Sequence, residues 1–357
     1  MINKSIIGNI RLAAHNLTKP SCKTPQEVVK HLGAIQAQDF VMAKWAVGIR
    51  ITGSTEQMIE NAFNRGEIVR THVLRPTWHF VSPEHIRWML ALSAKHIKSA
   101  AAGRDRELGI TPELFTKTND LIIKLLEGGN HLTREQLTES LQNAGIAVDS
   151  ARMSHFLMRA EVDAIICSGA MQGKKQTYTL LDERISNVGA TSALPMPTHE
   201  ESLSKLAEMY FKSHNPATLH DFVWWSGLSI TDARKGLESV KNRFTEIIID
   251  GQSYFFDPNI VPDNNSQAFL LPAFDEYIIA YRDRSAVITS EQYTKAISSN
   301  GIFRPTIIAN GKVIGLWRKT SLKNRPFSFE YFEQPDSSIQ KMVENAAERL
   351  KKWYLCS

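Results

Sequence analysis

A pattern of helical segments followed by two strand-like runs occurs three times along the 357 residues and constrains the fold most. In the middle copy, Pro112 begins a segment with apolar residues at helical spacing, and Gly128-Gly129-Asn130 ends it. Thr133 to Gln136 forms a capping-box signature for a second helix, and a third helix is predicted over 150–162. Strand-like runs at 164–167 and 176–181 follow. Three helices and a hairpin in this order are typical of a winged helix.

The other two copies follow the same order. One covers 199–257 and has predicted helices at 201–211, 219–225 and 231–240. Thr218 and Ser229 cap the last two of these helices. A hairpin of 244–249 and 252–256, with its turn at Asp250-Gly251, follows them. The first copy, at 5–82, is less regular. Its predicted elements are helices at 7–17, 24–32, 41–49 and 55–63 and strand-like runs at 68–74 and 77–81. A helix over 84–107 connects it to the middle copy.

The pattern changes after Pro262, where strands become frequent. They are predicted at 268–272, 277–281, 304–308, 312–317 and 327–332, with Asn310-Gly311 as a type I′ turn and a final helix at 337–354. The fold class is therefore predicted as α+β, mainly α: tandem winged-helix (helix-turn-helix) units followed by a C-terminal β-barrel-like domain. The predicted domains are 1–107, 108–192, 193–262 and 263–357, with linkers at 192–197 and 258–265.

Composition narrows the class of protein. With 43% hydrophobic and 22% charged residues the chain is able to bury a core. No run of 18 apolar residues occurs and the N-terminus lacks the features of a signal peptide, so we expect no membrane partner. Cys22, Cys167 and Cys356 are scattered, which excludes a disulfide scaffold and suits a reducing cytoplasm.

Positive charge is concentrated near both ends of the chain. The net charge is +5, and residues 1–75 alone supply an equal excess. Residues 301–329 contain no acid but carry Arg304, Lys312, Arg318, Lys319, Lys323 and Arg325. Two such segments could line one groove that holds a polyanion, and winged helices make DNA the first candidate. The alternative is that they are ordinary solvated surface.

Several types of site are absent from the sequence. It contains no phosphate-binding Gly-x-x-x-x-Gly-Lys-Ser/Thr loop, no Gly-x-Gly-x-x-Gly and no Gly-x-Ser-x-Gly. Its histidines do not have the His-x-x-x-His spacing of a zinc site with a nearby glutamate. We therefore expect neither a metal nor any other cofactor.

Two carboxamides stand beside an acid within an apolar segment, at Gln36-Ala37-Gln38-Asp39. On a regular helix, positions i and i+2 point about 200° apart, so both amides can share a cavity only where the backbone is extended or turning. The alternative interpretation is that Gln36 caps a helix end and Gln38 faces water.

Two further clusters place polar residues among apolar ones. In the run Arg75-Pro-Thr-Trp-His-Phe, strand alternation sends Arg75, Thr77 and His79 to one face, although His79 could equally lie on an ordinary exposed strand. Asp275 stands between apolar residues, and we predict an ion pair with Arg282 or Arg284 that holds the barrel against the winged helices.

Four motifs in order give the chain a resemblance that extends over nearly its whole length. They are Gln36-Ala-Gln-Asp39 with Trp45, Arg75-Pro-Thr-Trp-His79, Leu271-Pro-Ala-Phe-Asp275 and Val313-Ile-Gly-Leu-Trp-Arg318. Together they resemble the AlkZ-like winged-helix DNA glycosylases. The resemblance implies tandem winged helices with a β-barrel and a catalytic Gln-x-Gln or Gln-x-Asp motif in a cleft. Gln36 and Gln38 match the first form; the branch that unhooks crosslinks broadly has Asp second, so Gln38 argues against that branch.

The implied function is DNA repair of alkylation damage. The enzyme would be a monofunctional glycosylase that hydrolyses the N-glycosidic bond of N7-alkylated, including crosslinked, purines in double-stranded DNA. N7-alkylation makes the base a cationic, good leaving group, and the transition state resembles an oxocarbenium ion. Gln36 and Gln38 would position the attacking water, with Asp39, Thr77 and His79 as supporting residues of the cleft.

The residues expected to bind DNA are basic and distributed along the chain: Arg75, Arg152, Arg159, Lys174, Lys175, Arg318 and Lys319. One alternative function is a non-catalytic winged-helix regulator that inserts 150–162, with Arg152 and Arg159, into the major groove and places Lys174 and Lys175 on phosphates. Another is an interaction scaffold without DNA affinity. Three winged units without an obvious dimerisation module favour the enzyme, acting as a monomer.

Overall fold

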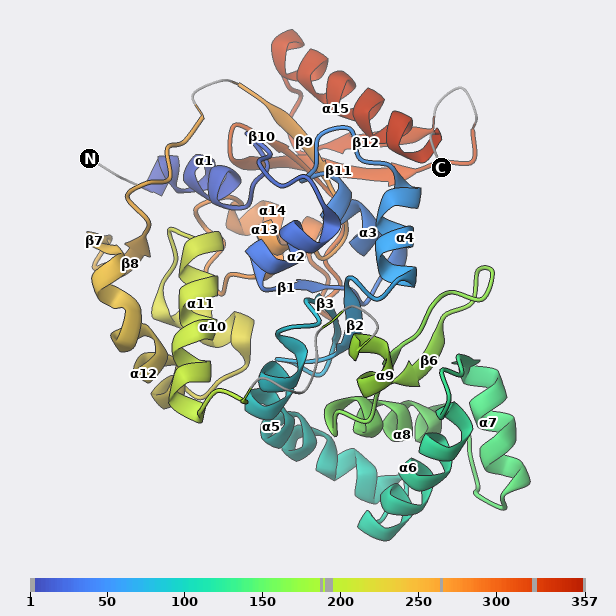
Figure 1. Ribbon diagram of the computed structural model, residues 1–357. Helices are drawn as coiled ribbons and strands as arrows, with labels where there is room; N and C mark the ends of the chain where they lie inside the picture. The colour runs from blue at the N-terminus through green and yellow to red at the C-terminus, as the bar shows by residue number, and fades with distance from the viewer. Residues whose placement is uncertain (1–3, 187–188, 190–194, 264–265, 323–325, 356–357) are drawn as a thin grey trace. The chain divides into compact units, whose positions relative to one another are not determined.

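The computed structural model describes residues 4–186, 189, 195–263, 266–322 and 326–355 (Figure 1). It is 50% helical and 17% strand, which confirms a mixed fold in which helices predominate. Part of each predicted linker lies outside the described residues, at 192–194 and 264–265, as do Lys323, Arg325 and Cys356. In the described part, no helix has the length and apolar character needed to cross a membrane.

The chain forms two compact units. The first combines Met1–Glu60 with Leu203–Ser357, and the second is Asn61–Ser202. The chain therefore leaves the first unit after its N-terminal helices and returns to it near residue 203. The four domains predicted from the sequence do not follow this division, because 1–107 and 193–262 each include parts of both units, and they stay a prediction.

The first unit contains most of the helices and a four-stranded sheet. Its elements are α1 (Lys4–Ala14), α2 (Pro25–Leu32), β1 (Ala34–Gln36), α3 (Phe40–Gly48), most of α4 (Glu56–Asn64) and of α10 (His199–Ser213), α11 (Leu219–Ser226), α12 (Ile230–Val240), the 3-10 turn Lys241–Arg243, β7 (Thr245–Ile249), β8 (Gln252–Phe256), β9 (Ala268–Leu271), α13 (Glu276–Ile279), α14 (Ser290–Ala296), β10 (Thr306–Ala309), β11 (Lys312–Lys319), β12 (Phe327–Tyr331) and α15 (Ser337–Leu355).

The sheet of the first unit is antiparallel and open. Its strand order is β12-β11-β10-β9, with Thr306 of β10 opposite Leu316 on one side and Leu271 on the other. Helix α15 packs against β9 and β10 (Figure 1). In the described chain the predicted barrel is thus not closed, because β12 and β9 are edges rather than partners.

One predicted strand of that barrel is wrong. Residues 277–279 belong to the helical turn α13 and Ala280 is its C-terminal cap, while Tyr281 follows outside any strand. Asp275 caps this turn by accepting a hydrogen bond from the backbone N–H of Tyr277 at 2.9 Å. A short apolar run cannot be assigned to strand or helix by its periodicity, so the capping acid decides.

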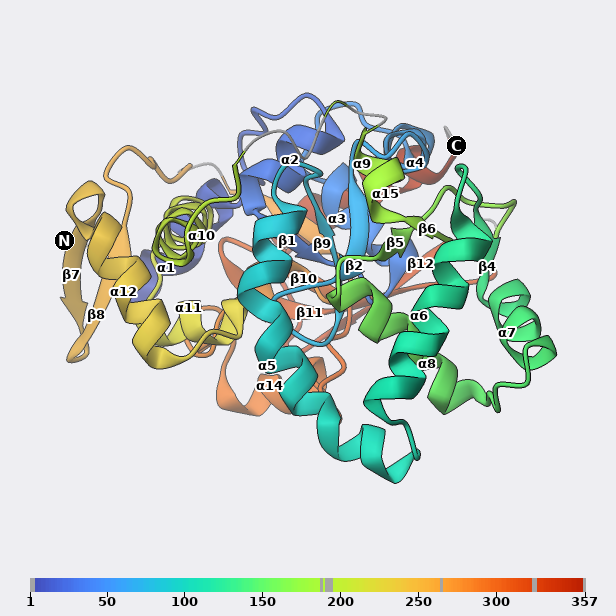
Figure 2. The same ribbon diagram turned by 60° about the horizontal axis from the view of Figure 1, so that its bottom comes forward.

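The second unit begins with a hairpin and continues with long helices. Its elements are β2 (Val69–His72), β3 (Trp78–Val81), α5 (Ile86–Glu107), α6 (Pro112–Leu126), β4 (Leu132–Thr133), α7 (Arg134–Asn143), α8 (Ser150–Val162), β5 (Ile166–Ser168), β6 (Thr177–Leu180) and α9 (Leu181–Ser186). Strands β4, β6 and β5 form a sheet in that order, and α8 packs on both α5 and α6 (Figure 2).

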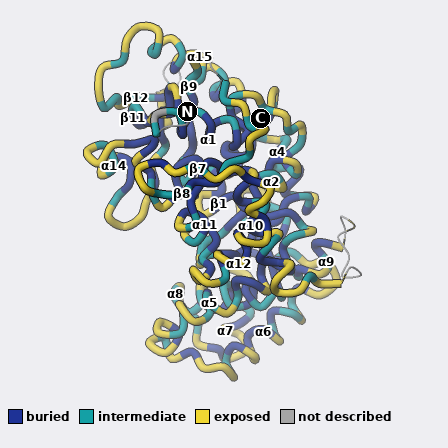
Figure 3. The backbone as a smooth tube through the Cα atoms, turned by 90° about the vertical axis from the view of Figure 1, so that its left-hand side faces the viewer, coloured by how far each residue is buried: buried dark blue, intermediate teal, exposed yellow. Residues whose placement is uncertain are grey.

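The core of the second unit is apolar. Phe115, Ile122, Leu137 and Phe156 belong to one cluster of buried side chains. Helix α7 contributes Leu137 and Leu141 to that cluster and exposes most of its other residues (Figure 3). The apolar residues whose helical spacing predicts these helices are the ones that are buried in this cluster.

Local capping and turn signals are confirmed where the sequence predicts them. Thr133 and Thr218 each form a complete capping box, and Ser229 caps α12. Asn310 and Gly311 have φ angles of 48° and 74°, the left-handed values that a type I′ turn requires. These features depend on neighbouring residues alone, which is why the sequence predicts them.

Candidate active site

The Gln-x-Gln segment lies in the first unit, between a strand and a helix. Helix α2 ends at Gly33, whose φ of 78° suits glycine and where a Cβ would lie 3.1 Å from Met209 Cε and 3.5 Å from Trp225 Cη2. The chain then forms β1 and enters α3 at Phe40. Both glutamines therefore lie on non-helical backbone, as a shared catalytic role requires.

Gln36 is buried, with 6% of its surface exposed. Its backbone N–H donates to Glu276 Oε1 at 2.8 Å. Its side-chain Oε1 is buried and accepts no hydrogen bond from the described residues. Leaving a buried acceptor unsatisfied costs about 1–3 kcal/mol, so such atoms are uncommon and need an explanation. A polar molecule bound at Oε1, such as water, would satisfy it.

Gln38 and Asp39 are both exposed. Asp39 caps α3, because its Oδ1 accepts the backbone N–H of Met42 at 3.1 Å. The alternative that Gln36 caps a helix end is therefore wrong, since Asp39 occupies that position. The other half of that alternative is confirmed: Gln38 faces solvent.

The carboxyl group of Glu276 lies beneath Gln36 and is fully buried. Besides Gln36, it accepts the indole N–H of Trp225 at 3.1 Å from Oε2. His214 Nε2 lies 3.7 Å from the same oxygen, which is too far for a hydrogen bond. Burial lowers the pKa of His214, although Glu276 acts in the opposite direction. His214 is therefore neutral near pH 7 and forms no ion pair with Glu276.

The proton positions around His214 follow from its neighbours. Ser213 donates its hydroxyl to the Met209 carbonyl at 2.8 Å, so His214 Nδ1 donates to Ser213 Oγ at 2.8 Å. Tyr281 donates to the His214 carbonyl at 2.9 Å, and His15 Nε2 therefore donates to the Tyr281 oxygen at 2.7 Å. Burial lowers the pKa of His15 well below its usual value. His15 and His214 are thus polar but uncharged.

Asp275, next to Glu276, forms its ion pair with Arg50. The predicted pairing with Arg282 or Arg284 is wrong: Asp275 accepts Arg50 NH1 at 2.9 Å and NH2 at 2.8 Å, with both side chains fully buried. Arg284 Nε instead donates to the Ile278 carbonyl at 2.8 Å. The residues of this pair are 225 positions apart, so no sequence pattern could have identified it.

Arg75, Thr77 and His79 belong to the second unit. Arg75 and Thr77 precede β3, and His79 lies in β3 opposite Thr71. His79 is fully buried rather than exposed, so the alternative of an exposed strand is wrong. Its Nδ1 donates to the Thr77 carbonyl at 2.9 Å, while its Nε2 and Thr77 Oγ1 are buried without a partner among the described residues. Burial, assisted by the charge of Arg75, lowers the pKa of His79 well below its usual value.

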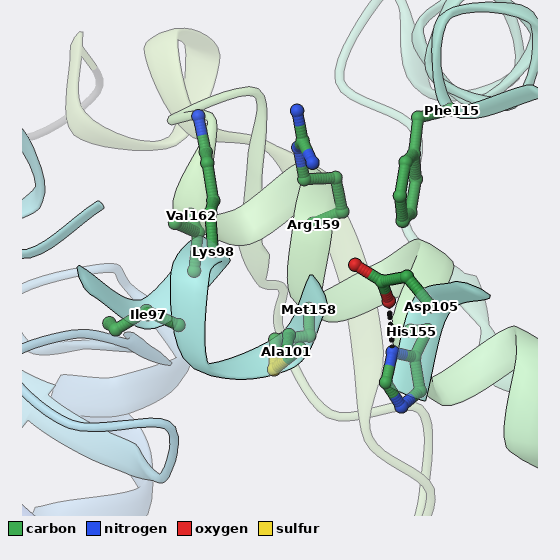
Figure 4. A pocket seen from close by; sticks show the side chains of 9 residues that line it. All are labelled: Ile97, Lys98, Ala101, Asp105, Phe115, His155, Met158, Arg159 and Val162. Carbon is green, nitrogen blue, oxygen red and sulfur yellow. Dashed lines mark hydrogen bonds and ion pairs between the residues drawn. The ribbon is translucent and has the colours of Figure 1, made fainter. Parts of the chain in front are cut away.

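The two arginines of α8 contact their own unit. Arg152 lies 5.8 Å from the Phe156 ring centroid. Arg159 donates to Asp163 at 2.9 Å and lies 4.7 Å from the Phe115 ring centroid. Arg159 also lines a cavity of about 10 Å³, room for about one water molecule, beside the His155–Asp105 pair (Figure 4). Arg159 is therefore already ion-paired.

The four remaining basic residues are exposed. Lys174 and Lys175 lie between β5 and β6, and Lys175 is 3.6 Å from Glu135. At the end of β11, Arg318 donates to Ser328 at 2.9 Å and Lys319 lies 4.0 Å from the Tyr354 ring centroid. All four present charge to solvent, as a phosphate-binding surface requires.

The chain as a whole matches a class of DNA repair protein. Residues 29–353 match the model of the family described as DNA glycosylase AlkZ-like, and the chain belongs to this family. A curated relative, the interstrand DNA cross-link repair glycosylase of Streptomyces sahachiroi, is 24% identical over 314 residues, which are 84% of this chain and 82% of the relative. The solved structure of the Streptomyces sahachiroi DNA glycosylase AlkZ has a TM-score of 0.82 at 20% identity, over 99% of this chain and 96% of that one. This last likeness shows the fold.

Proposed function

We propose that the protein is a monofunctional DNA glycosylase that hydrolyses the N-glycosidic bond of N7-alkylated purines in double-stranded DNA. The observation that carries the proposal is the buried amide oxygen of Gln36, which accepts no hydrogen bond from the described residues. Gln36 lies on non-helical backbone, two residues before the exposed Gln38. Membership in a family of DNA glycosylases supports the reaction type.

In the proposed mechanism the protein supplies position rather than a strong acid. The cationic base is already a good leaving group, and positive charge develops on the deoxyribose. The amide oxygens of Gln36 and Gln38 orient a water molecule towards C1′ and direct their negative dipole ends at the developing charge. Asp39 supports this site from within the same unit. Supporting roles for Thr77 and His79, which lie in the second unit, stay a prediction from the sequence.

The element order supports an arrangement of tandem winged helices. In the second unit α6, α7 and α8 precede the β5–β6 hairpin, and in the first unit α10, α11 and α12 precede β7–β8. We propose that these are winged helices and that 1–107, 108–192, 193–262 and 263–357 are the domains of a cytoplasmic monomer.

The proposed DNA surface consists of the basic residues predicted from the sequence. It comprises Arg75, Arg152, Arg159, Lys174, Lys175, Arg318 and Lys319. Because Arg159 is ion-paired with Asp163, we expect the exposed lysines to contribute more to phosphate binding than Arg159 does.

The relative is named for interstrand crosslinks, and crosslinked N7-alkylpurines are the second proposed substrate. Gln38 takes the position where broad crosslink unhooking has Asp, so we expect base release from a single N7-alkylguanine to be faster than from a crosslink. Single-turnover assays on matched duplexes that carry either lesion test this order.

Replacing Gln36 or Gln38 by Ala tests the mechanism. Losing one oriented polar group costs on the order of 10²–10³ in rate, whereas phosphate contacts supply most of the affinity. We therefore expect base release under single turnover to fall by about that factor, with DNA affinity nearly unchanged. Gln38→Glu keeps the shape and adds a charge, so we expect an altered pH dependence.

Gln57→Ala is the matched control, because Gln57 is exposed on α4 of the same unit. Melting temperatures of all variants show whether the fold is intact. If both alanine variants at the motif release base at the wild-type rate, the catalytic assignment is wrong. Binding without excision by any form would favour the non-catalytic regulator.

Water attack also predicts the response to inhibitors. Among the described residues no group of three His, Cys, Asp or Glu side chains could hold a metal. Lys44, close to the motif in sequence, lies 2.5 Å from Glu56 and 3.1 Å from Glu60, an ion pair unsuited to a Schiff-base nucleophile. We expect activity to survive a chelator and borohydride to trap no enzyme–DNA adduct. A trapped adduct would contradict water attack.

A further inference from the structure

A buried carboxyl group holds the backbone of the proposed catalytic residue. Glu276 has no exposed surface, and its two oxygens each accept one N–H: that of the Gln36 backbone at 2.8 Å and that of the Trp225 indole at 3.1 Å. Glu276 and Gln36 are 240 residues apart in the sequence. The contact lies entirely within the first unit.

The chain is shaped to present Glu276 at this point. Phe274 has a φ of 59°, a left-handed value that is uncommon for any residue other than glycine. Asp275 then caps α13 and binds Arg50 through both of its oxygens. Strained backbone and a buried ion pair therefore fix the start of the helical turn on which Glu276 is the first residue.

The N-cap of α13 is Asp275 rather than Glu276. The neighbouring His214 is neutral and forms no ion pair with Glu276. Burying a charged carboxyl group is costly unless hydrogen bonds compensate for the lost solvation. Two N–H donors provide this compensation, and one of them belongs to the residue whose amide oxygen is unpartnered.

We propose that Glu276 is a positioning residue that fixes the backbone of Gln36, so that the side-chain amide oxygen stays directed at the attacking water. This inference rests on the proposed role of Gln36 in base excision. Glu276 itself touches neither water nor DNA in this role. It acts because a misplacement of about 1 Å can cost about 10² in rate.

The substitution Glu276→Gln removes this function with little change in volume. Both partners of Glu276 are N–H donors, and a carboxamide has only one accepting oxygen. If its NH₂ group faces the Gln36 N–H, that hydrogen bond is lost. If it faces the Trp225 N–H, the neutral amide oxygen holds the Gln36 N–H more weakly than a carboxylate oxygen does. We expect the single-turnover rate to fall by about 10- to 100-fold at unchanged DNA affinity.

Asp221→Asn is the matched control. Asp221 is also fully buried in the first unit and also accepts backbone N–H groups, those of Arg282 at 2.8 Å and Asp283 at 3.2 Å. It does not contact Gln36 in any hydrogen bond of the structure. Melting temperatures should fall for both variants, whereas the excision rate should fall for Glu276→Gln only.

A double-mutant cycle with Gln36→Ala decides the case. If Glu276 acts through the Gln36 side chain, Glu276→Gln lowers the rate in the wild-type background and has no further effect in the Gln36→Ala background. Equal rate losses in both backgrounds, or an equal loss in Asp221→Asn, would overturn the proposal. A Gln36→Ala protein that excises at the wild-type rate would instead refute the proposed function itself.

Glu276→Asp covers the case in which the glutamine variant does not fold. It keeps the charge and withdraws the carboxyl group by one methylene from Gln36. We expect the same non-additive loss of rate. The proposal is overturned if a folded Glu276→Asp protein keeps the wild-type rate although its crystal structure shows that the hydrogen bond to Gln36 is lost.

Discussion

The surroundings of Gln36 in the first unit and the helical cluster of the second unit differ in what they bury. In the first unit fully buried side chains include Arg50, Asp275 and Glu276, which are joined into hydrogen-bonded networks. The central cluster of the second unit is apolar, although Glu161 is buried there with His72 and with Trp78 Nε1 at 3.2 Å. An apolar core tolerates small shifts of its members, whereas a buried ionic network fixes its members in one geometry.

This difference locates the proposed chemistry. A glycosylase that works by positioning a water molecule needs a rigid support more than a strong acid. The unit that contains Gln36 and Gln38 has such support behind Gln36, in Glu276, which follows the ion-paired Asp275. The second unit has the regular helices that the sequence predicts.

The largest effect on stability is expected from breaking the buried ion pair. Asp275→Ala leaves Arg50 buried without its partner, which typically costs about 3–5 kcal/mol of unfolding free energy. Ile122→Val in the apolar core of the second unit should cost only about 0.5–1.5 kcal/mol. Chemical denaturation of both variants measures the contrast, and equal losses would remove the distinction between the two cores.

Acid should weaken both units through their buried histidines. The pKa values of His15 and His214 in the first unit and of His79 in the second lie below the ordinary 6.5, chiefly because of burial. The unfolded chain therefore binds more protons below pH 6.5, so stability is full above that pH and is lost as the pH falls. At about pH 5.5, each histidine that stays neutral in the folded protein lowers the unfolding free energy by at most about 1.4 kcal/mol.

Melting temperatures between about pH 7.5 and pH 5.5 test this expectation. His79→Gln and His15→Gln should each lower stability at the higher pH but lose less than the wild type on acidification. A loss on acidification as large as that of the wild type in both variants would show that other groups cause it.

The capping boxes should behave alike in the two units. Thr133→Ala and Thr218→Ala each remove an N-cap of the same type, and each should cost about 1 kcal/mol in thermal or chemical unfolding. A much larger loss for Thr218→Ala would show that this cap is coupled to the buried network through Asp221, its capping partner.

The smallest effects concern phosphate contacts. Each lysine or arginine that binds a phosphate should reduce the slope of log affinity against log salt concentration by about 0.9 when replaced by Ala. We expect this for Lys174 and Lys175 of the second unit and for Arg318 and Lys319 of the first. Titration of a random duplex over a range of salt concentrations shows which unit binds the DNA backbone. Unchanged slopes for all four variants would show that these residues are not part of the proposed DNA surface.

By itself, the sequence determines the features that nearest neighbours decide. Helix α8 was predicted over its observed range, Ser150–Val162, and the caps at Thr133 and Thr218 and the turn at Asn310-Gly311 were predicted correctly. The sequence also singled out the Gln36 and Gln38 pair. Capping and turn formation act over about four residues, so the pattern contains all the information that is needed.

The tertiary structure alone decides what lies behind that pair. The short elements β1, α9 and α14 have no recognisable sequence pattern. The run that contains α13 has the pattern of a strand, because the sequence does not show that Asp275 caps a helical turn there. The burial of Gln36, its support by Glu276 and the pairing of Asp275 with Arg50 join residues more than 200 positions apart. Periodicity and spacing act over a few turns of the chain, whereas these contacts exist only after the chain has returned to its first unit and packed there.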